Sequence, residues 1–332
     1  MSSSGSPGRF PNRAMPRPEP VEGPFPLQPE DIGKVNHVFS EAFTDRYQRD
    51  GLSGVRVPPL NPAIWKFAIA SAGEGAMQWR DGSGQVVAFN LAHCCGSEGW
   101  MGPLAVRPGR QGEGIGALIV ETGIRWLRAA GARVIGLETM PRTVENIGFY
   151  SRLGFRPEHL TVSLTKDLTA APPDAQGQLL SRMASEEGME SCGRLLEAIV
   201  PGLSFAREIT LTRAHCLGDT TMVEDSTGLG GFALWHSAPL AEGKPDDEVR
   251  VLKLAARDGD AFRQLLRAIE TAGWARGARR IAIRCQTAYR EAYGSLLESG
   301  YRVHWTDLRM TLNGMAEPST PDGAVVFSNW EI

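Results

Sequence analysis

The residues of this chain best suited to chemistry form a short run of glycines alternating with other residues, Gln111-Gly112-Glu113-Gly114-Ile115-Gly116. The first backbone N–H groups of a helix have no partner inside the helix and lie at the positive end of its dipole. Because glycine has no Cβ, its backbone can approach phosphate oxygens closely and adopt the angles of a tight loop. With a helix beginning here, the run predicts a site for a phosphate or pyrophosphate group. Arg107 and Arg110 add positive charge beside it.

The flanking residues predict the elements that hold this run in place. An apolar segment at 104–106 ends a strand before it, and apolar residues at helical spacing follow it from Ile115 to Leu127. Gly131 then ends the helix. A second strand ends at Glu138, and the helix after it carries Tyr150. The predicted order is therefore strand, phosphate loop, helix, strand and helix.

The same glycines fit a second phosphate-binding pattern, the dinucleotide fingerprint. Gly112, Gly114 and Ala117 have its spacing, and Glu138 falls where a ribose-binding acid would follow the next strand. In that fold the strand runs straight into the first glycine, whereas here a segment containing Pro108 separates the two. This interruption disfavours a dinucleotide site.

The run resembles the acetyl-CoA motif of the GNAT superfamily of N-acetyltransferases: Gln or Arg, two residues, Gly, one residue, then Gly or Ala. Residues 111–116 match every fixed position. A second family motif, a tyrosine four residues before Gly-Phe, is met by Tyr150 and Gly154-Phe155. The polar position seven residues before the tyrosine, usually Asn, is Thr143 here, and the nearby Asn146 is not the family's asparagine. Thr143 can still cap a helix.

The resemblance implies an α/β fold with a mixed sheet and direct transfer of an acetyl group from acetyl-CoA, or of another acyl group from its CoA, to an amine, without a metal. The reaction requires a base for the ammonium proton, a donor for the carbonyl oxygen and an acid for the departing thiolate. By resemblance, a backbone N–H on the motif strand is the oxyanion donor and the phenol of Tyr150 is the acid. The expected acyl-CoA contacts are Leu104, Ala105, Val106, Arg110, Gln111, Gly112, Glu113, Gly114, Ile115, Gly116, Thr143, Asn146 and Tyr150.

The base has several candidates. Glu138 leads because it ends the strand after the motif helix, at the edge where open α/β sheets place their chemistry. Glu98, His93 and a water chain to solvent are the alternatives. A protein that binds acyl-CoA without turning it over, as a sensor or scaffold, is a different possibility, but Tyr150 favours catalysis. By the same resemblance, the helices before Ala76 line the acceptor side, and here they carry charges of both signs without an acidic cluster that would favour a polycation. A small metabolite, a peptide terminus, a lysine side chain and an aminoglycoside all stay open, and we expect a small-molecule amine.

The composition predicts a soluble cytoplasmic protein. The 332 residues are 42% hydrophobic and 22% charged, with a formal net charge of −3. Such a balance does not favour nucleic acid as a partner. No apolar run is long enough to span a bilayer, and the first residues lack a signal-peptide core. We expect no membrane partner, and a monomer or homodimer.

Two similar segments predict that the fold occurs twice. Gly131 and Gly277 begin one matching pair of segments and Gly154 and Gly300 lie in another, both at an offset of 277 − 131 = 300 − 154 = 146. A shared offset indicates a tandem duplication. The expected organisation is a disordered arm at 1–22, a first GNAT domain at 23–169, a linker at 170–177, a second GNAT-like domain at 178–312 and a tail at 313–332 with an edge strand near 324–327.

The second unit is predicted to be a degenerate copy. From Ala255 to Gly277 is 22 positions, against 26 for the matching stretch of the first unit, so the phosphate loop is missing. Asp260 is predicted to cap the following helix, which places a carboxylate where a phosphate would bind. The position that matches the motif tyrosine is Leu296. We expect this unit to support the first by packing, or to wall its substrate pocket.

Overall fold

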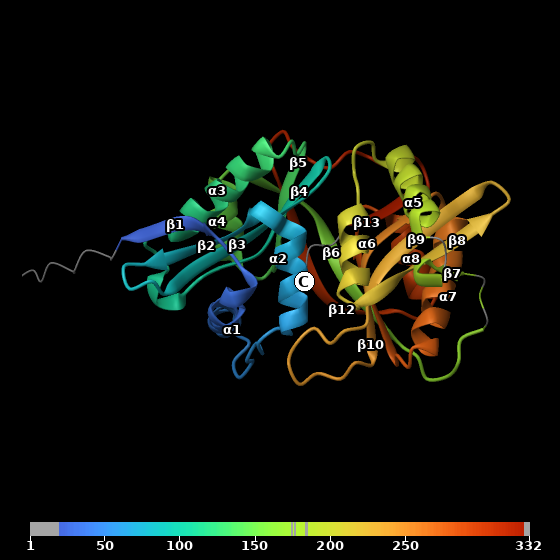
Figure 1. Ribbon diagram of the computed structural model, residues 1–332, viewed down its shortest axis with the longest axis horizontal. Coiled ribbons are helices and arrows are strands. Elements are labelled where there is room, and N and C mark those ends of the chain that lie inside the picture. The colour runs from blue at the N-terminus through green and yellow to red at the C-terminus, as the bar shows by residue number, and fades with distance from the viewer. Residues whose placement is uncertain (1–19, 174, 176, 183–184, 329–332) are drawn as a thin grey trace, which may run out of the picture.

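The computed structural model describes residues 20–173, 175, 177–182 and 185–328, whose strands join into one 13-stranded mixed sheet. Figure 1 shows the two halves of the chain side by side, with helices on the sheet in each half. This mixed α/β fold with two similar units is the one that the sequence predicts. Most of the arm predicted at 1–22 lies outside the described residues.

The first half contains the elements expected around the glycine run. Asn61 caps the second helix, because its side chain accepts a hydrogen bond from the Ala63 N–H at 3.0 Å, and Pro62 occupies the first helical position. The elements of this half are β1 (Val21–Pro26), α1 (Ile32–Arg49), α2 (Pro62–Ala72), β2 (Ala76–Asp81), β3 (Val86–Cys95), β4 (Glu98–Val106), α3 (Ile115–Ala129), β5 (Val134–Thr139), α4 (Val144–Arg152) and β6 (Phe155–Asp167).

The second half repeats this order after a short first strand. Its elements are β7 (Gln178–Leu179), α5 (Ser185–Ile199), α6 (Ala206–Ala214), β8 (Gly218–Asp225), β9 (Gly228–His236), β10 (Glu248–Ala256), α7 (Gly259–Ala275), β11 (Arg280–Gln286), α8 (Arg290–Glu298), β12 (Arg302–Leu312) and β13 (Val325–Ser328). The first residues of α4 and α8 are 146 positions apart, since 290 − 144 = 146, and so are their last residues, since 298 − 152 = 146. The offset read from the sequence is therefore also the offset of the structure.

The two halves exchange their last long strands. The strand order is β1-β2-β3-β4-β5-β12-β6-β11-β10-β9-β8-β7. Thus β12 of the second half pairs antiparallel with β5 of the first, β6 of the first half pairs antiparallel with β11 of the second, and the two exchanged strands pair with each other. The predicted domain boundaries divide the chain, but neither half closes its sheet without a strand from the other.

Helices cover both faces of the sheet in each half. In the first half, α1 and α2 bury Trp65 against Phe89 on one face, and α3 buries Ile119 and Leu127 on the other. In the second half, α5 and α6 cover one face and α7 and α8 the other. The helices α3 and α7 each bury an apolar stripe on the sheet, which is the pattern expected of a two-sided α/β layer.

The C-terminal tail does form a strand, but not at an edge of the sheet. β13 pairs antiparallel with β10, which already pairs with β9 and β11. The tail strand therefore lies where β10 and β11 part, rather than beside an outermost strand. None of the helices among the described residues has the length and apolar character needed to cross a bilayer.

Candidate acyl-CoA and acceptor site

The strands β4 and β5 separate before β4 reaches the glycine run. They pair in parallel from Glu98 opposite Val134 to Met101 opposite Leu137, and no further. Beyond Met101, β4 continues to Val106 in pairing with β3 alone. We call the divergence beyond this last pair the first splay. One backbone edge of β4, including the predicted oxyanion position at 104–106, has no strand beside it among the described residues.

The loop after β4 presents backbone N–H groups at the start of α3. Gly112 and Gly114 have φ of 86° and 85°, a region that favours glycine. In the described part of the chain, the N–H groups from Gly112 to Ala117 have no hydrogen-bond acceptor. A Cβ built on Gly112 or Gly114 would meet no atom within 4 Å, so the space beside them is open. An anion fits this arrangement, because it receives N–H groups that the helix itself cannot satisfy.

The polar side chains of the loop hold its shape. Gln111 donates its amide to the carbonyl oxygen of Val106 at 3.1 Å and accepts from Arg49 of α1 at 3.3 Å. Arg110 and Glu113 form an ion pair at 2.8 Å, so the carboxylate does not face the helix start uncompensated. Arg107 is bonded to Gln85 at 2.8 Å.

The helices α3 and α4 approach closely beside the splay. A Cβ on Gly116 would lie only 3.2 Å from the ring of Phe149, so a larger residue there would force that ring to move. Ile115 is 5% exposed and belongs to the core under α3. Its side chain therefore packs in the core, and only its backbone is available to a ligand.

Tyr150 lies on α4 and packs its ring against Phe149 and Phe155, with ring centroids 5.1 and 6.1 Å away. The residue is 7% exposed, and burial raises the pKa of its phenol to about 12. Its hydroxyl has no hydrogen-bond partner among the described residues. A phenol in this state is protonated throughout the physiological range and has a proton to donate.

The two other polar positions predicted near α4 are already engaged. Thr143 lies at the start of α4 but does not cap it; its hydroxyl donates to the carboxylate of Asp50 instead. Arg46 binds Asp50 at 2.7 Å and Glu145 at 2.6 Å, so this cluster fastens the end of α1 to the start of α4. Asn146 donates to the hydroxyl of Thr139 at 3.3 Å. The structure thus gives both residues structural contacts near the splay.

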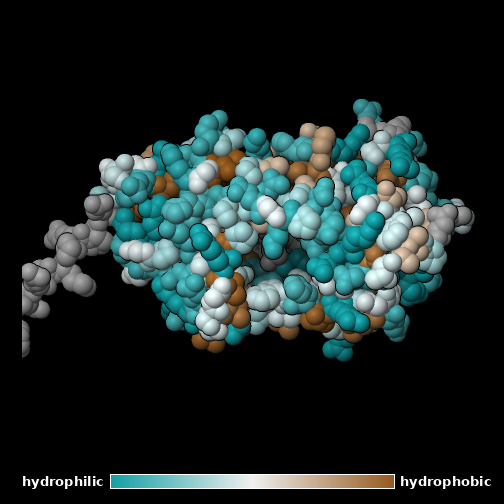
Figure 2. All heavy atoms as spheres, turned by 90° about the horizontal axis from the view of Figure 1, so that it is seen from below, coloured by the Kyte–Doolittle hydropathy of each residue, from teal (hydrophilic) through white to brown (hydrophobic). Residues whose placement is uncertain are grey.

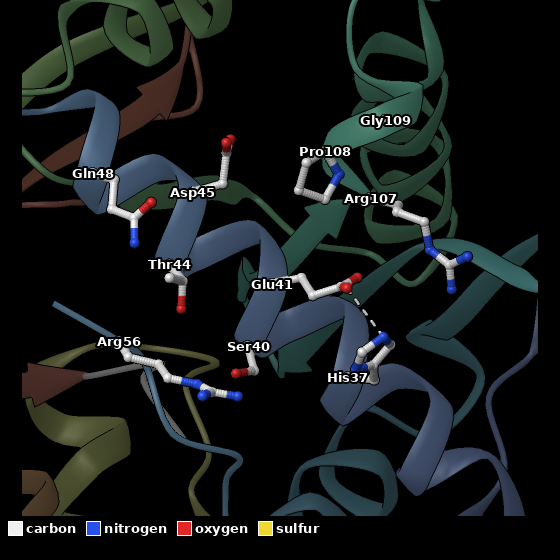
Figure 3. A pocket seen from close by; sticks show the side chains of 10 residues that line it. All are labelled: His37, Ser40, Glu41, Thr44, Asp45, Gln48, Arg56, Arg107, Pro108 and Gly109. Carbon is white, nitrogen blue, oxygen red and sulfur yellow. Dashed lines mark ion pairs between the residues drawn. The ribbon is translucent and has the colours of Figure 1, made fainter. Parts of the chain in front are cut away.

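A groove of about 620 Å³ runs between α1 and the start of the glycine loop. Figure 3 shows α1 as one wall, with His37 and Glu41 forming an ion pair at 3.1 Å, and the segment 107–109 as the other. The face of the molecule that carries α1 is hollowed near its middle (Figure 2). Both signs of charge border the groove. Its lining residues are His37, Ser40, Glu41, Thr44, Asp45, Gln48, Arg56, Arg107, Pro108 and Gly109.

Glu138, the leading base from the sequence, is held by two arginines of the second half. Arg284 of β11 donates to its carboxylate at 2.6 Å and Arg309 of β12 at 2.8 Å, and Thr161 donates as well. Burial alone would raise the pKa of Glu138, but the two guanidinium groups and these hydrogen bonds outweigh it and lower the pKa to about 2. A carboxylate so engaged is a poor proton acceptor, and this geometry disfavours Glu138 as the base.

The alternative bases also lie in buried surroundings. His93 is 5% exposed, its Nε2 lies 3.1 Å from the carbonyl oxygen of Gly102, and burial followed by the charge of Lys253 lowers its pKa to about 3. Glu98 is 3% exposed and accepts from the indole N–H of Trp100 at 3.0 Å. Burial, and next the neighbouring Glu317, raises the pKa of Glu98. Glu98 lies at the start of β4, away from the splay.

Two features of the site could not be found by local reasoning. Arg284 and Arg309 lie 146 and 171 positions from Glu138 in the chain and reach it only because β11 and β12 enter the shared sheet. Arg309 is fully buried and also lies 3.6 Å over the ring of Trp100. Among the described residues, no group of three or more His, Cys, Asp or Glu side chains is arranged to hold a metal ion.

Comparison with known proteins agrees with this architecture. Residues 40–155, which contain the first splay and its loop, match the model of the acetyltransferase (GNAT) family. This part of the chain, which is about a third of its length, is similar to that family.

Solved structures that resemble the whole chain show the same fold at low sequence identity. A tandem GNAT protein from the clavulanic acid biosynthesis pathway has a TM-score of 0.58 at 16% identity, over 90% of this chain and 100% of that one. N-myristoyltransferase from Saccharomyces cerevisiae, with bound myristoyl-CoA, has 0.61 at 11% identity, over 90% and 84%. A GCN5-related N-acetyltransferase from Sphaerobacter thermophilus has 0.57 at 15% identity, over 90% and 96%. The fold is that of tandem GNAT proteins and N-myristoyltransferase.

Proposed function

We propose that this protein is an N-acyltransferase that transfers an acetyl group from acetyl-CoA to the amine of a small molecule. The observation that carries the proposal is the first splay, which ends at a helix start with unpaired N–H groups and open space beside Gly112 and Gly114. The match of residues 40–155 to the acetyltransferase (GNAT) family supports it independently.

The loop residues bind the CoA end of the donor in this proposal. N–H groups from Gly112 to Ala117 receive the pyrophosphate, and Arg110 adds positive charge to the loop although it is paired with Glu113. The unpaired edge of β4 receives the extended arm that ends in the thioester. A backbone N–H of 104–106 on that edge then stabilises the oxygen of the carbonyl as it becomes negative.

The chemical step forms a C–N bond and breaks a C–S bond. The free amine attacks the thioester carbonyl carbon, and the thiolate leaves as the carbonyl re-forms. The phenol of Tyr150, which its pKa near 12 keeps protonated, donates its proton to this thiolate, and the proton that the new amide nitrogen loses restores the phenol through water. The ammonium proton of the acceptor leaves through water in the groove, since Glu138 is committed to Arg284 and Arg309.

The groove along α1 is the proposed acceptor site. It borders the loop at Pro108 and Gly109, and it carries Glu41 and Asp45 on the same wall as His37, with Arg56 nearby. A volume of about 620 Å³ suits a small molecule. The mixture of charges fits a polar amine that also carries an acidic group better than a polycation.

Calorimetric titration of the full chain with acetyl-CoA tests the donor site first. We expect one site per chain, held by the first splay, and release of free CoA thiol when a panel of small amines is added. Two sites would show that the second unit also binds acyl-CoA, and no binding would contradict the proposal. One bound acetyl-CoA without thiol release from any amine would favour the alternative, a binding protein that acts as a sensor or scaffold.

A further inference from the structure

The second half has a splay of its own, and the C-terminal strand fills it. β10 and β11 pair in parallel from Glu248 opposite Arg280 to Val251 opposite Ile283, and then separate. From Lys253 to Ala256, β10 pairs instead with β13, which also contacts β11. We call this divergence of β10 and β11 the second splay. The four residues of β13 are all at most 5% exposed.

One aromatic side chain anchors the strand. The ring of Phe327 lies between Phe262 of α7 and Tyr289, each with a centroid distance of 5.8 Å. At the offset of 146, the counterparts of Phe262 and Tyr289 in the first half are Gly116 and Thr143. The second splay therefore has aromatic walls where the first has small residues, and these walls fit a side chain of an extended peptide.

The strand β13 satisfies backbone groups of β10 that β11 leaves unpaired. Beyond Val251, β11 no longer pairs with β10, and among the described residues β13 is the strand that takes its place. Without it, buried N–H and C=O groups of β10 would have no partner, which costs free energy at each group. The occupant is not part of the repeated unit, because it arrives after β12 through the segment 313–324.

We propose that the second splay is a docking site for an extended peptide strand, with the C-terminal segment Ala324–Ser328 as its resident occupant. Recognition combines a main-chain ladder along β10 with one aromatic pocket, the chemistry of strand addition. The covalent tether holds the resident strand at a high effective concentration, so it excludes other peptides from the intact chain. This inference does not depend on the proposed enzymatic activity.

Docking of the strand is also connected to the first half. Arg309 donates to the hydroxyl of Ser328 at 2.9 Å and to its carbonyl oxygen at 3.3 Å, and the same guanidinium holds Glu138. Glu317 binds Arg309 at 2.6 Å independently of the strand. A chain ending at Thr320 would therefore lose the strand but keep a carboxylate partner from the tail on the buried arginine.

The test uses that shortened chain, residues 1–320, and a fluorescent peptide of residues 321–332. We expect the peptide to bind the shortened chain at one site, and the full chain to bind it at least ~10-fold more weakly because its own strand is in place. The same peptide with Phe327→Ala should bind at least ~10-fold more weakly than the natural one, because the pocket loses its aromatic side chain. A peptide of scrambled sequence is the control.

Equal binding of the peptide to both chains, or no binding to a folded shortened chain, would overturn the proposal. So would a second acetyl-CoA site that appears in the shortened chain without peptide binding. If the shortened chain does not fold, hydrogen exchange of the full chain decides. Phe327→Ala should then speed exchange in β13 and at residues 253–256 of β10 together, with β4 unchanged, and unchanged exchange in β10 would contradict docking.

Discussion

The two splays share one geometry and differ in what they contain. The last pair before each divergence is Met101 with Leu137 and Val251 with Ile283, so the offsets are 251 − 101 = 150 on one strand and 283 − 137 = 146 on the other. The offset falls from 150 to 146 because the connection from β10 to α7 is shorter than the one from β4 to α3. The first splay is open beside a glycine loop, whereas the second is filled by β13. The two similar units thus share their strand register, although the space between the parted strands is open in one and holds a strand in the other.

The difference lies in the loop that follows the first strand of each splay. The first half uses residues 107–114 between strand and helix, with glycines at positive φ that leave N–H groups unpaired. The second half uses only Arg257 and Asp258, and the carboxylate of Asp258 accepts from the Ala261 N–H at 2.8 Å. The N–H groups at the first helix start thus have no acceptor among the described residues, whereas the second helix start has a carboxylate of its own. Loop length therefore decides whether such a unit has room for a phosphate.

The largest effect is expected when one acidic residue of the second half is copied into the glycine loop of the first, because the loop then carries a carboxylate as the second helix start does. Gly114 corresponds to Asp260 at the offset of 146. Gly114→Asp places a negative charge beside the N–H groups that we propose as the pyrophosphate site, and we expect acetyl-CoA affinity to fall by roughly 100-fold or more, about 3 kcal/mol. Calorimetric titration measures the loss directly.

Gly114→Asn is the matched control for that variant. Asn and Asp are nearly equal in size and both tolerate the left-handed backbone that Gly114 adopts, so they share the same strain and differ in charge. We expect Asn to keep most of the affinity. An equal loss in both variants would mean that bulk rather than charge closes the site, and an Asp variant that still binds would refute the placement of the phosphate on this loop.

Sequence patterns located the elements of the first splay because each pattern is local. The glycine run, the helix through Ile119 and Leu127 and the position of Tyr150 all depend on residues close together in the chain. The repeated offset of 146 was equally visible, and it places α8 correctly. The predicted cap at Asp260 was wrong by two residues: Asp258 caps α7, and Asp260 binds Arg263 at 2.5 Å. Both residues satisfy a capping pattern, and only the end of β10 decides between them.

The exchange of β6 and β12 could not be predicted, because strand pairing between halves leaves no local pattern. It has a chemical consequence, since it delivers Arg309 and Arg284 to Glu138 and changes a candidate base into a structural carboxylate. The sequence pointed to the helices before Ala76 as the acceptor side, but it gave no local pattern for 107–109 as the wall that faces α1. Pairings between distant segments decided the details of the site.

A second, smaller difference between the halves is the phenol of Tyr150, whose counterpart at the same offset is Leu296. Tyr150→Phe keeps the buried ring and removes the hydroxyl and its proton. We therefore expect kcat to fall roughly 30-fold, about 2 kcal/mol, while acetyl-CoA affinity stays within about twofold. Steady-state kinetics with calorimetry separates these effects. Because burial raises the pKa of Tyr150 to about 12, the natural enzyme should lose no activity through this group up to about pH 10.

An unchanged kcat in Tyr150→Phe would remove the phenol from the mechanism and leave water as the acid. Phe149→Leu is a useful companion, because it disturbs the neighbouring ring contact at 5.1 Å without touching the hydroxyl. A fall in kcat in both variants would indicate that packing of α4, rather than proton donation, is what matters. Retention of activity in the Phe149 variant alone supports the acid.

The smallest expected effect tests why the second helix start is closed. Asp258→Ala removes the cap of α7, and we expect a loss of about 1 kcal/mol in unfolding free energy, with faster hydrogen exchange in the first turn of that helix. Asp258→Asn can still accept the bond from Ala261 and should lose much less. Acetyl-CoA stoichiometry should stay at one in both variants, because two connecting residues give a phosphate no loop to bind and β13 still fills the second splay. A second acetyl-CoA bound by Asp258→Ala would show that the carboxylate alone, and not loop length or the strand, distinguishes the two halves.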